Sequence, residues 1–256
     1  MLSETHIEIA KNALDKARTI ALTYFNNPGI LKNEFKDIKT LVDLKMNECL
    51  IEELSRTGFP ILSEESELQN EIFPECGWVI DPLDGTFNFT RKFPCVGISI
   101  AFMENRIPSY GFVKDIFNDI TYSCEPNRKA NKNGYEMNVS DESKLGNAIL
   151  ATGFPSGSNY ETNELLTFIS NVQEFKKIRA IGCASLMLCL VAEGIFDVYY
   201  EKGIYIWDVA AGLALVQAAG GKYLLKEMSD PFKYEVVASN PLIFRTACQK
   251  LTGNLS

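Results

Sequence analysis

Between about residues 145 and 225, the chain alternates between short strand-like runs and helix-like stretches. The strand-like runs are AILATGF, KKIRAIG, FDVYYE and GKYLL, and the expected helices lie near 161–173, 183–193 and 207–219. Alternation of this kind favours a mixed sheet that is layered with helices. The pattern therefore predicts an α/β arrangement for the second half of the chain.

The first half of the chain has a different pattern. Apolar side chains at helical spacing predict amphipathic helices, and short apolar runs predict strands. The helices are expected at 5–26 and 41–56, the strands at 59–62 and 77–81, and an antiparallel meander at 95–103, 109–115 and 119–124. For the whole chain we therefore predict an α+β or α/β fold in which helices and sheets form layers.

The chain is expected to have two halves that share one core. Residues 1–144 are expected to form an N-terminal α+β half, and residues 145–256, which include Asp208, are expected to form a C-terminal α/β half. Since the composition does not shift sharply near residue 145, we expect one compact unit.

Composition and charge exclude several functions. The net charge of −8, without a long basic run, argues against a nucleic acid as the main ligand. Charged residues interrupt every apolar run near the N-terminus, so we expect no signal peptide and no membrane span. The seven cysteines form no CxxC pair and are expected to be reduced, which is typical of a cytoplasmic protein. Because His6 is the one histidine, any catalytic metal is expected to be held by oxygen.

Two carboxylates flank a Pro-Leu pair directly after an apolar run, in the stretch WVIDPLDGTFNF at 78–89. Asp81 and Asp84 would repel each other unless something positive lay between them. Magnesium prefers oxygen ligands, and the Leu83 carbonyl is free to join the two acids if the chain bends there. The amides of Gly85 and Thr86 would then face a phosphate.

Three further acidic stretches follow the same design. They contribute Glu64 and Glu65 after a short strand, Asp208 at the start of a helix, and Asp37, Thr40 and Asp43 at three-residue spacing. Each has a simpler explanation: Asp208 as a helix N-cap, Glu64 and Glu65 as a solvated turn, Asp37 as a turn residue and Asp43 as a surface residue. Taken together, the acids predict a site for two or three Mg²⁺ ions, which suits phosphoryl transfer.

Haloacid-dehalogenase-type phosphatases present a similar motif, Asp-x-Asp-Gly-Thr, near the start of the chain. Their acids are two residues apart, and the first is a covalent nucleophile. Here the acids are three residues apart, at 81 and 84, and follow two helices. The difference changes which carboxylates can converge, so we reject this alternative.

The sequence resembles the inositol monophosphatase family of Mg²⁺-dependent, lithium-sensitive sugar-phosphate phosphatases. The matching stretches are DIKTLVD (37–43), SEES (63–66), DPLDGTFNF (81–89) and the long segment at 180–212 that contains WDVAAG. They follow the family's order and spacing over nearly the whole chain. The resemblance implies a layered αβαβα sandwich, hydrolysis by direct attack of a metal-activated water, and a homodimer.

The resemblance also implies a role for individual residues. The implied metal ligands are Glu64, Asp81, the Leu83 carbonyl, Asp84 and Asp208. The implied catalytic residues are Thr86 and Asp43, which orient the attacking water, with Glu65 in support. The implied substrate-binding residues are Gly85 and Thr86 at the phosphate and Gly182, Cys183, Ala184 and Glu201 at the alcohol.

Three positions depart from the family pattern. Ser63 replaces a usual glycine, Lys129-Ala130 replaces a frequent glycine-alanine pair, and Cys183 replaces a small hydroxyl residue. None of them is an implied metal ligand, but Cys183 weakens any inference about the sugar that binds.

The substrate is expected to be a small phosphorylated polyol or sugar, with inositol 1-phosphate first. Glu201 lies seven residues before Asp208, and a carboxylate accepts hydrogen bonds from polyol hydroxyls. Glu201 as a surface partner of Lys202 is the simpler explanation. The alternatives are fructose 1,6-bisphosphate, histidinol phosphate or a 3′-phosphoadenosine nucleotide with the same chemistry, and a partner-binding regulator on the same fold.

Overall fold

The computed structural model describes residues 2–34, 37–66, 75–126, 129–154, 161–230 and 232–253; the side chains of residues 34 and 37 lie outside this description. Its helices are α1 (Glu4–Tyr24), α2 (Leu41–Ser55), α3 (Thr86–Thr90), α4 (Thr162–Val172), α5 (Ala184–Ala192), α6 (Ile206–Ala218) and α7 (Phe244–Thr252), with a 3-10 turn, η2 (Leu145–Asn147). None of the helices in these ranges combines the length and the apolar character that crossing a membrane requires.

The strands form two larger sheets and one hairpin. The first sheet has the order β3 (Ile61–Ser63), β4 (Cys76–Asp84), β5 (Gly97–Glu104), β6 (Ile107–Asp115), β7 (Ile120–Cys124), β8 (Asn131–Lys132), β9 (Tyr135–Glu136). The second has the order β11 (Lys177–Arg179), β10 (Ile149–Thr152), β12 (Val198–Tyr205), β14 (Lys233–Ser239), β13 (Lys222–Glu227). The hairpin is β1 (Ile30–Glu34) with β2 (Asp37–Thr40).

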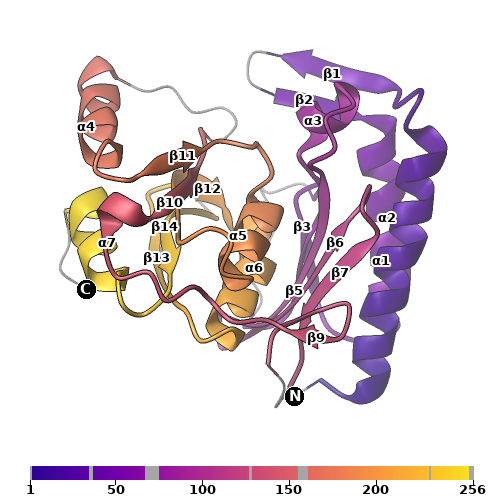
Figure 1. The fold of residues 1–256 in the computed structure, drawn as a ribbon. Coiled ribbons are helices and arrows are strands. Elements are labelled where there is room, and N and C mark those ends of the chain that lie inside the picture. The colour runs from indigo at the N-terminus through magenta and orange to yellow at the C-terminus, as the bar shows by residue number, and fades with distance from the viewer. Residues whose placement is uncertain are drawn as a thin grey trace.

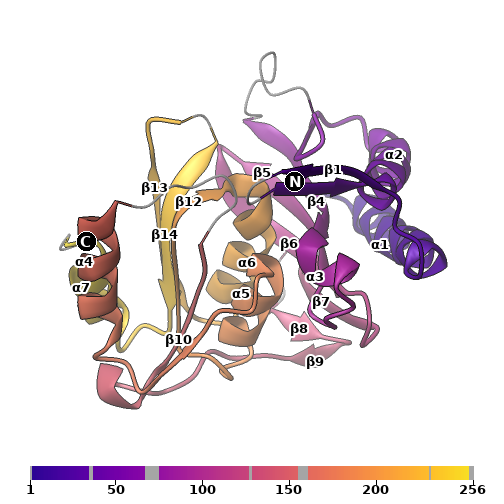
Figure 2. The same cartoon turned by 90° about the horizontal axis from the view of Figure 1, so that it is seen from above.

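These elements stack in five layers (Figure 1). Helices α1 and α2 cover the outer face of the first sheet, α5 and α6 lie between the two sheets, and α4 and α7 lie outside the second sheet (Figures 1 and 2). The predicted αβαβα sandwich is therefore confirmed. The expected meander is also confirmed, because β5, β6 and β7 pair antiparallel in sequence order.

Three groups of buried side chains occupy the spaces between the layers. One fills the gap between α1, α2 and the first sheet, one surrounds α5 and α6 between the sheets, and one lies between the second sheet and α7. The middle group joins the two halves of the chain, since Leu62 and Val79 of the first sheet belong to it together with Val236 of the second.

A close backbone contact fixes α6 against the first sheet. A Cβ atom built on Gly111 of β6 would lie 2.2 Å from the carbonyl oxygen of Ala211 in α6. Any side chain at this position would push the helix away. Helix α6 begins at Ile206, shortly before Ala211. The contact at Ala211 therefore also limits where the first turn of α6, which contains Asp208, can lie relative to the first sheet.

Several elements differ from the sequence prediction. Strand β12 continues to Tyr205, so Glu201 lies inside the strand and not at its end. The hairpin β1–β2, the short helix α3, strand β14 and helix α7 were not predicted.

Candidate active site

The two acids of the DPLD stretch leave the end of β4 at a bulge. Between Asp81 and Asp84, β4 advances three residues while the paired strand β5 advances two. Pro82 has no N–H to give to the ladder, which favours such a break. Asp81 Oδ1 accepts from the Leu83 amide at 2.9 Å, and the Leu83 carbonyl accepts from the Thr86 hydroxyl at 3.0 Å. The bend therefore places both acids and the Leu83 carbonyl next to one another.

Asp84 is bound by the first turn of α5. Its Oδ2 accepts from the amide and the hydroxyl of Ser185, each at 2.6 Å, and from Cys183 Sγ at 3.1 Å. Its Oδ1 accepts from the Ala184 amide at 3.2 Å. Burial raises the pKa of Asp84, and these hydrogen bonds oppose the rise. The sequence analysis does not identify Ser185, because a small polar residue near the start of a helix is too common a signal.

Asp208 lies in the first turn of α6, where its Oδ2 accepts from the Tyr205 amide at 3.2 Å. The N-cap residue is Tyr205, so Asp208 assists the cap from the third helical position and is not itself the N-cap. Burial, followed by the carboxylates of Glu64, Asp84 and Glu201, raises the pKa of Asp208 well above its usual range. Capping alone does not explain an acid placed against three others.

Glu201 is buried, with 4% of its surface exposed. Burial, and then the Asp84 carboxylate, raises the pKa of Glu201 to about 8. Its neighbour Lys202 is exposed and pairs with Glu164 at 3.4 Å. The alternative that Glu201 is a surface partner of Lys202 is therefore wrong.

The SEES stretch is anchored at the edge of β4. The Glu64 amide donates to the Ile80 carbonyl at 3.2 Å, and the carboxyl group of Glu64 hydrogen-bonds to that of Asp81, although Glu64 as a whole is exposed. Glu65 has a buried side chain that forms an ion pair with Lys39 of β2. A solvated turn therefore does not describe Glu65. Its partner Lys39 is not among the residues that the sequence analysis identifies.

Ser63, the departure from the family's glycine, has a structural role. Its hydroxyl donates to Asn47 Oδ1 of α2 at 2.7 Å and accepts from the Glu65 amide at 3.3 Å. Ser63 thus ties the acidic turn to α2.

Asp43 is held in a fixed orientation at the start of α2. Its Oδ2 accepts from the amide and the hydroxyl of Thr40, the N-cap residue, and its Oδ1 accepts from the Thr86 hydroxyl at 3.0 Å. Only 3% of Asp43 is exposed, so it is not a surface residue. Burial raises its pKa, which makes the carboxylate a better proton acceptor.

The proposed substrate side is built from two chain segments. Gly85 has a φ of 92°, and a Cβ there would lie 3.0 Å from the Cys95 carbonyl and 3.1 Å from the Gly182 carbonyl. Gly182 is exposed, whereas Cys183 and Ala184 are buried and contact Asp84. Asn88 Nδ2 donates to both segments, at 2.9 Å to the Cys95 carbonyl and at 3.1 Å to that of Gly182.

The acids expected as metal ligands are thus brought together. Burial, and then the carboxylates of Glu64, Asp84 and Asp208, raises the pKa of Asp81 well above its usual range. Burial, together with neighbouring carboxylates, also raises the pKa values of Glu64 and Asp208, so these acids need protons or cations to coexist with Asp84. An all-oxygen set of this kind fits Mg²⁺. Over the ranges that the structure describes, no three acidic, cysteine or histidine side chains already surround a single point. Instead, several of their oxygens accept hydrogen bonds from the amides and hydroxyls described above.

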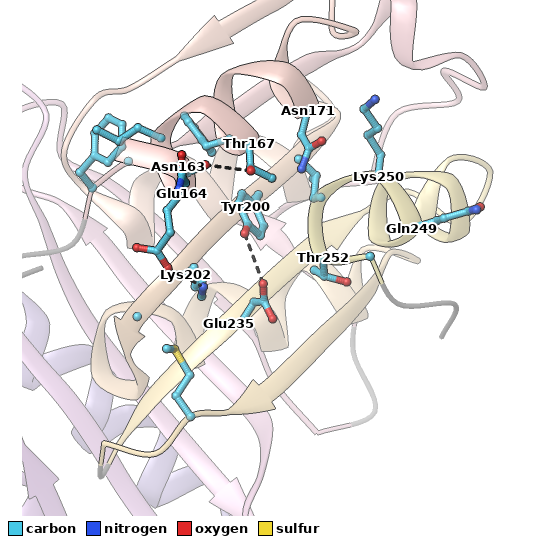
Figure 3. Close-up of a pocket in the computed structure, with 18 of the residues that line it drawn as sticks. Asn163, Glu164, Thr167, Asn171, Tyr200, Lys202, Glu235, Gln249, Lys250 and Thr252 are labelled. Carbon is cyan, nitrogen blue, oxygen red and sulfur yellow. Dashed lines mark hydrogen bonds and ion pairs between the residues drawn. The ribbon is translucent and has the colours of Figure 1, made fainter. Parts of the chain in front are cut away.

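A separate cavity of about 1090 Å³ lies between α4, α7 and the second sheet (Figure 3). Tyr200 and Lys202 point into it from β12, and the Tyr200 hydroxyl lies 3.3 Å from Glu235 Oε1. None of the clustered acids lines it. Because side chains alternate along a strand, Glu201 leaves β12 on the opposite face, towards the acids.

Known proteins match the chain over most of its length. The model of the inositol monophosphatase family matches residues 2–253. Inositol monophosphatase 1 of Bos taurus is 33% identical over 213 residues, 79% of this chain and 76% of that protein. The Nus factor SuhB of Escherichia coli K12 is 30% identical over 261 residues, 98% of this chain and 97% of that protein. The crystal structure of extragenic suppressor protein suhB from Bartonella henselae has a TM-score of 0.84 at 30% identity, covering 96% of this chain and 98% of that one.

These matches confirm the family resemblance drawn from the sequence motifs. The family's proteins are phosphoric monoester hydrolases that act on phosphorylated polyols and are generally metal-dependent. With a family model over nearly all of its residues and relatives at 30% identity or more, this chain belongs to the inositol monophosphatase family.

Proposed function

We propose that this chain is a Mg²⁺-dependent phosphomonoesterase that hydrolyses a small polyol or sugar phosphate, with inositol 1-phosphate as the first candidate. The observation that carries the proposal is the convergence of four acids with raised pKa values, Glu64, Asp81, Asp84 and Asp208, from three segments: the end of β3, the end of β4 and the first turn of α6. Structural ion-pair networks contain cations among their acids, whereas this group has none of its own in the contacts described above.

The residues that would hold the metal are these four acids together with the Leu83 carbonyl, and we propose two or three Mg²⁺ ions. When bound, Mg²⁺ supplies charge that offsets the negative phosphate in the transition state. The oxygen-only donor set suits that ion, because Mg²⁺ prefers carboxylates, carbonyls and water.

Thr86 and Asp43 are the residues that we propose to move a proton away from an attacking water. The Thr86 hydroxyl has one hydrogen, and Asp43 Oδ1 and the Leu83 carbonyl are both 3.0 Å from its oxygen. When that hydrogen points to Asp43, the Thr86 oxygen can accept a proton from water while its own passes to Asp43 Oδ1. Thr40 holds the other oxygen of Asp43, so the acceptor does not rotate away. Water is therefore the proposed nucleophile, and no covalent phosphoenzyme is expected.

We propose that Glu65, which forms an ion pair with Lys39 of β2, supports the positions of Thr86 and Asp43. The amides of Gly85 and Thr86 are proposed to hold the phosphate oxygens. We place the alcohol along Gly182, Cys183, Ala184 and Glu201.

The charge around Glu201 favours a singly phosphorylated substrate. A second phosphate near this buried acid would need a compensating cation, and Lys202 is the nearest in sequence. Lys202 points into the cavity of Figure 3 and pairs with Glu164. A polyol hydroxyl, in contrast, donates directly to a carboxylate oxygen. Fructose 1,6-bisphosphate, histidinol phosphate and 3′-phosphoadenosine nucleotides remain the alternatives with the same chemistry.

A partner-binding role is the alternative from another class. One relative that matches nearly the full length of this chain is named Nus factor SuhB. The name describes that relative and motivates the alternative for this chain. Lithium sensitivity, a homodimer and a cytoplasmic location also stand as proposals.

Asp208→Asn tests the site with little disturbance of the fold. The asparagine oxygen can still accept from the Tyr205 amide, while the charge and the metal ligand are lost. We expect phosphate release from a panel of phosphate monoesters to require Mg²⁺ in the wild type and to be largely abolished in the variant. The metal-free variant should be at least as stable as the wild type, because one repulsive charge has gone.

The matched control is Asp141→Asn, which removes the same charge at an exposed position outside the acid group. It should leave Mg²⁺-dependent phosphate release unchanged. Wild-type turnover by Asp208→Asn at ordinary Mg²⁺ would refute the site assignment. A phosphoryl group trapped on Asp81 would refute the water mechanism, and a preference for fructose 1,6-bisphosphate would refute the substrate assignment alone.

A further inference from the structure

Two cysteine side chains from distant parts of the sequence meet beside Asp84. Cys95 lies just before β5, and Cys183 lies just before α5. The thiol of Cys183 is a hydrogen-bonding neighbour of the thiol of Cys95, and Cys95 packs against the core group to which Cys183 belongs. Only Cys183 is fully buried; Cys95 is partly exposed. One thiol of the pair therefore reaches solvent and the other does not.

The backbone around the pair is held in place by Asn88 of α3. Its Nδ2 donates to the Cys95 carbonyl at 2.9 Å, to the Ile181 carbonyl at 2.8 Å and to the Gly182 carbonyl at 3.1 Å. A Cβ built on Gly97 would lie 3.5 Å from Cys183 Sγ, so that sulfur faces the start of β5. Neighbouring thiols on two fixed segments favour a disulfide, because its formation then needs little backbone movement.

We propose that Cys95 and Cys183 are an oxidative modification site, at which a peroxide converts the two thiols into a reversible disulfide. Cys95, the accessible member, attacks the peroxide oxygen to give a sulfenic acid and one water. Cys183 Sγ then attacks the Cys95 sulfur; the S–O bond breaks, and the hydroxyl leaves as a second water. The proton that Cys183 loses is the one that the departing hydroxyl takes up to become water. Overall, two thiols and one hydrogen peroxide give one disulfide and two waters.

The other cysteines lack this combination of neighbour and access. Cys76 is exposed and Cys49 is partly exposed, and neither has another thiol among its described contacts. Cys124 and Cys189 are near each other, but both are buried, and Cys124 Sγ accepts from the Gly111 amide at 3.1 Å. Peroxide therefore has no direct path to that pair.

The disulfide would alter the proposed substrate side. It removes the hydrogen that Cys183 donates to Asp84, and it ties the segment 181–183 to Cys95. Oxidation is therefore expected to reduce turnover. This consequence rests on the proposed function, whereas the disulfide itself does not.

The test uses the full chain, reduced and then treated with increasing hydrogen peroxide. Free thiols are alkylated, and the digested protein is examined by mass spectrometry for a peptide pair that joins Cys95 to Cys183. We expect this pair to appear in the wild type and in Cys76→Ser, and to revert with dithiothreitol. It must be absent from Cys95→Ser. Phosphate release should fall in proportion to the linked fraction in the first two proteins and should persist in Cys95→Ser, with each protein compared with its own activity before oxidation.

The proposal is overturned if oxidised wild-type protein contains no such pair while Cys76 is modified, or if peroxide inactivates Cys95→Ser as fast as the wild type. Thermal unfolding of each variant before treatment shows that it is folded. If the reduced protein releases no phosphate from any monoester, the proposed function fails, but the peptide analysis still decides the disulfide.

Discussion

Glu201→Gln is expected to make the stability of the metal-free protein less dependent on pH. Burial and the Asp84 carboxylate raise the pKa of Glu201 from its ordinary value of 4.5 to about 8. In the unfolded chain the carboxyl group loses its proton near its ordinary value, while in the folded chain it keeps the proton longer. Stability is therefore fully present below about pH 4.5 and is lost as the pH rises to about 8, since the unfolded state binds fewer protons over that window.

The size of the effect follows from the pKa difference. At about 1.4 kcal/mol per pKa unit, the rise corresponds to at most about 5 kcal/mol of stability lost between the two pH limits. Glutamine is uncharged and cannot contribute to this loss. Relative to the wild type, Glu201→Gln should therefore gain stability progressively from about pH 5 and level off above about pH 8.

The assay is urea unfolding in the presence of a chelator at a series of pH values from about 5 to 9. Glu53→Gln is the matched control, because Glu53 is also buried but lies beside Lys16 and Arg56, and the Lys16 hydrogen bond lowers its pKa. That variant should lose stability by the same amount throughout the range, since Glu53 is ionised at all of these pH values. A stability difference between Glu201→Gln and the wild type that does not change with pH would refute the reasoning.

Two further variants test the contacts around the acids. Thr86→Ala should slow phosphate release about 10²–10⁴-fold at saturating Mg²⁺ if its hydroxyl passes a proton to Asp43; a loss of less than about tenfold would remove Thr86 from that role. Asp84→Asn turns an NH₂ group towards the donors of Ser185 or Ala184 and should lower the stability of the metal-free protein by about 1–3 kcal/mol, measured by urea unfolding. Unchanged stability would show that α5 can reorient its first turn.

Much of the fold follows from local patterns in the sequence. Helices α1 and α2 begin and end within about two residues of their predicted limits, because amphipathic spacing and the Ser3 and Thr40 caps agree. The hairpin β1–β2 was missed because its strands are partly exposed and show no regular alternation. Helix α7 was missed because few of its residues are apolar; the buried ones are Ala247, Cys248 and Leu251.

The site was predictable to a lesser degree. The DPLD stretch indicated its own acids, because two carboxylates so close together need an explanation beyond a turn. The contacts that orient those acids were not predictable, since they join residues that are far apart in the chain. Ser185 lies 101 positions from Asp84, and Lys39 reaches Glu65 across a helix and a strand. Such pairs become visible only when the layers are stacked.

The link between Asp84 and α5 has a consequence for how the protein is made. During synthesis the end of β4 leaves the ribosome about a hundred residues before the turn that binds its acid, and Asp208 follows later still. Contacts of such high sequence separation form late, because a long loop must close first. A nascent chain that ends before α6 therefore holds an incomplete set of acids. The full set of proposed metal ligands can therefore assemble only after α6 has been made.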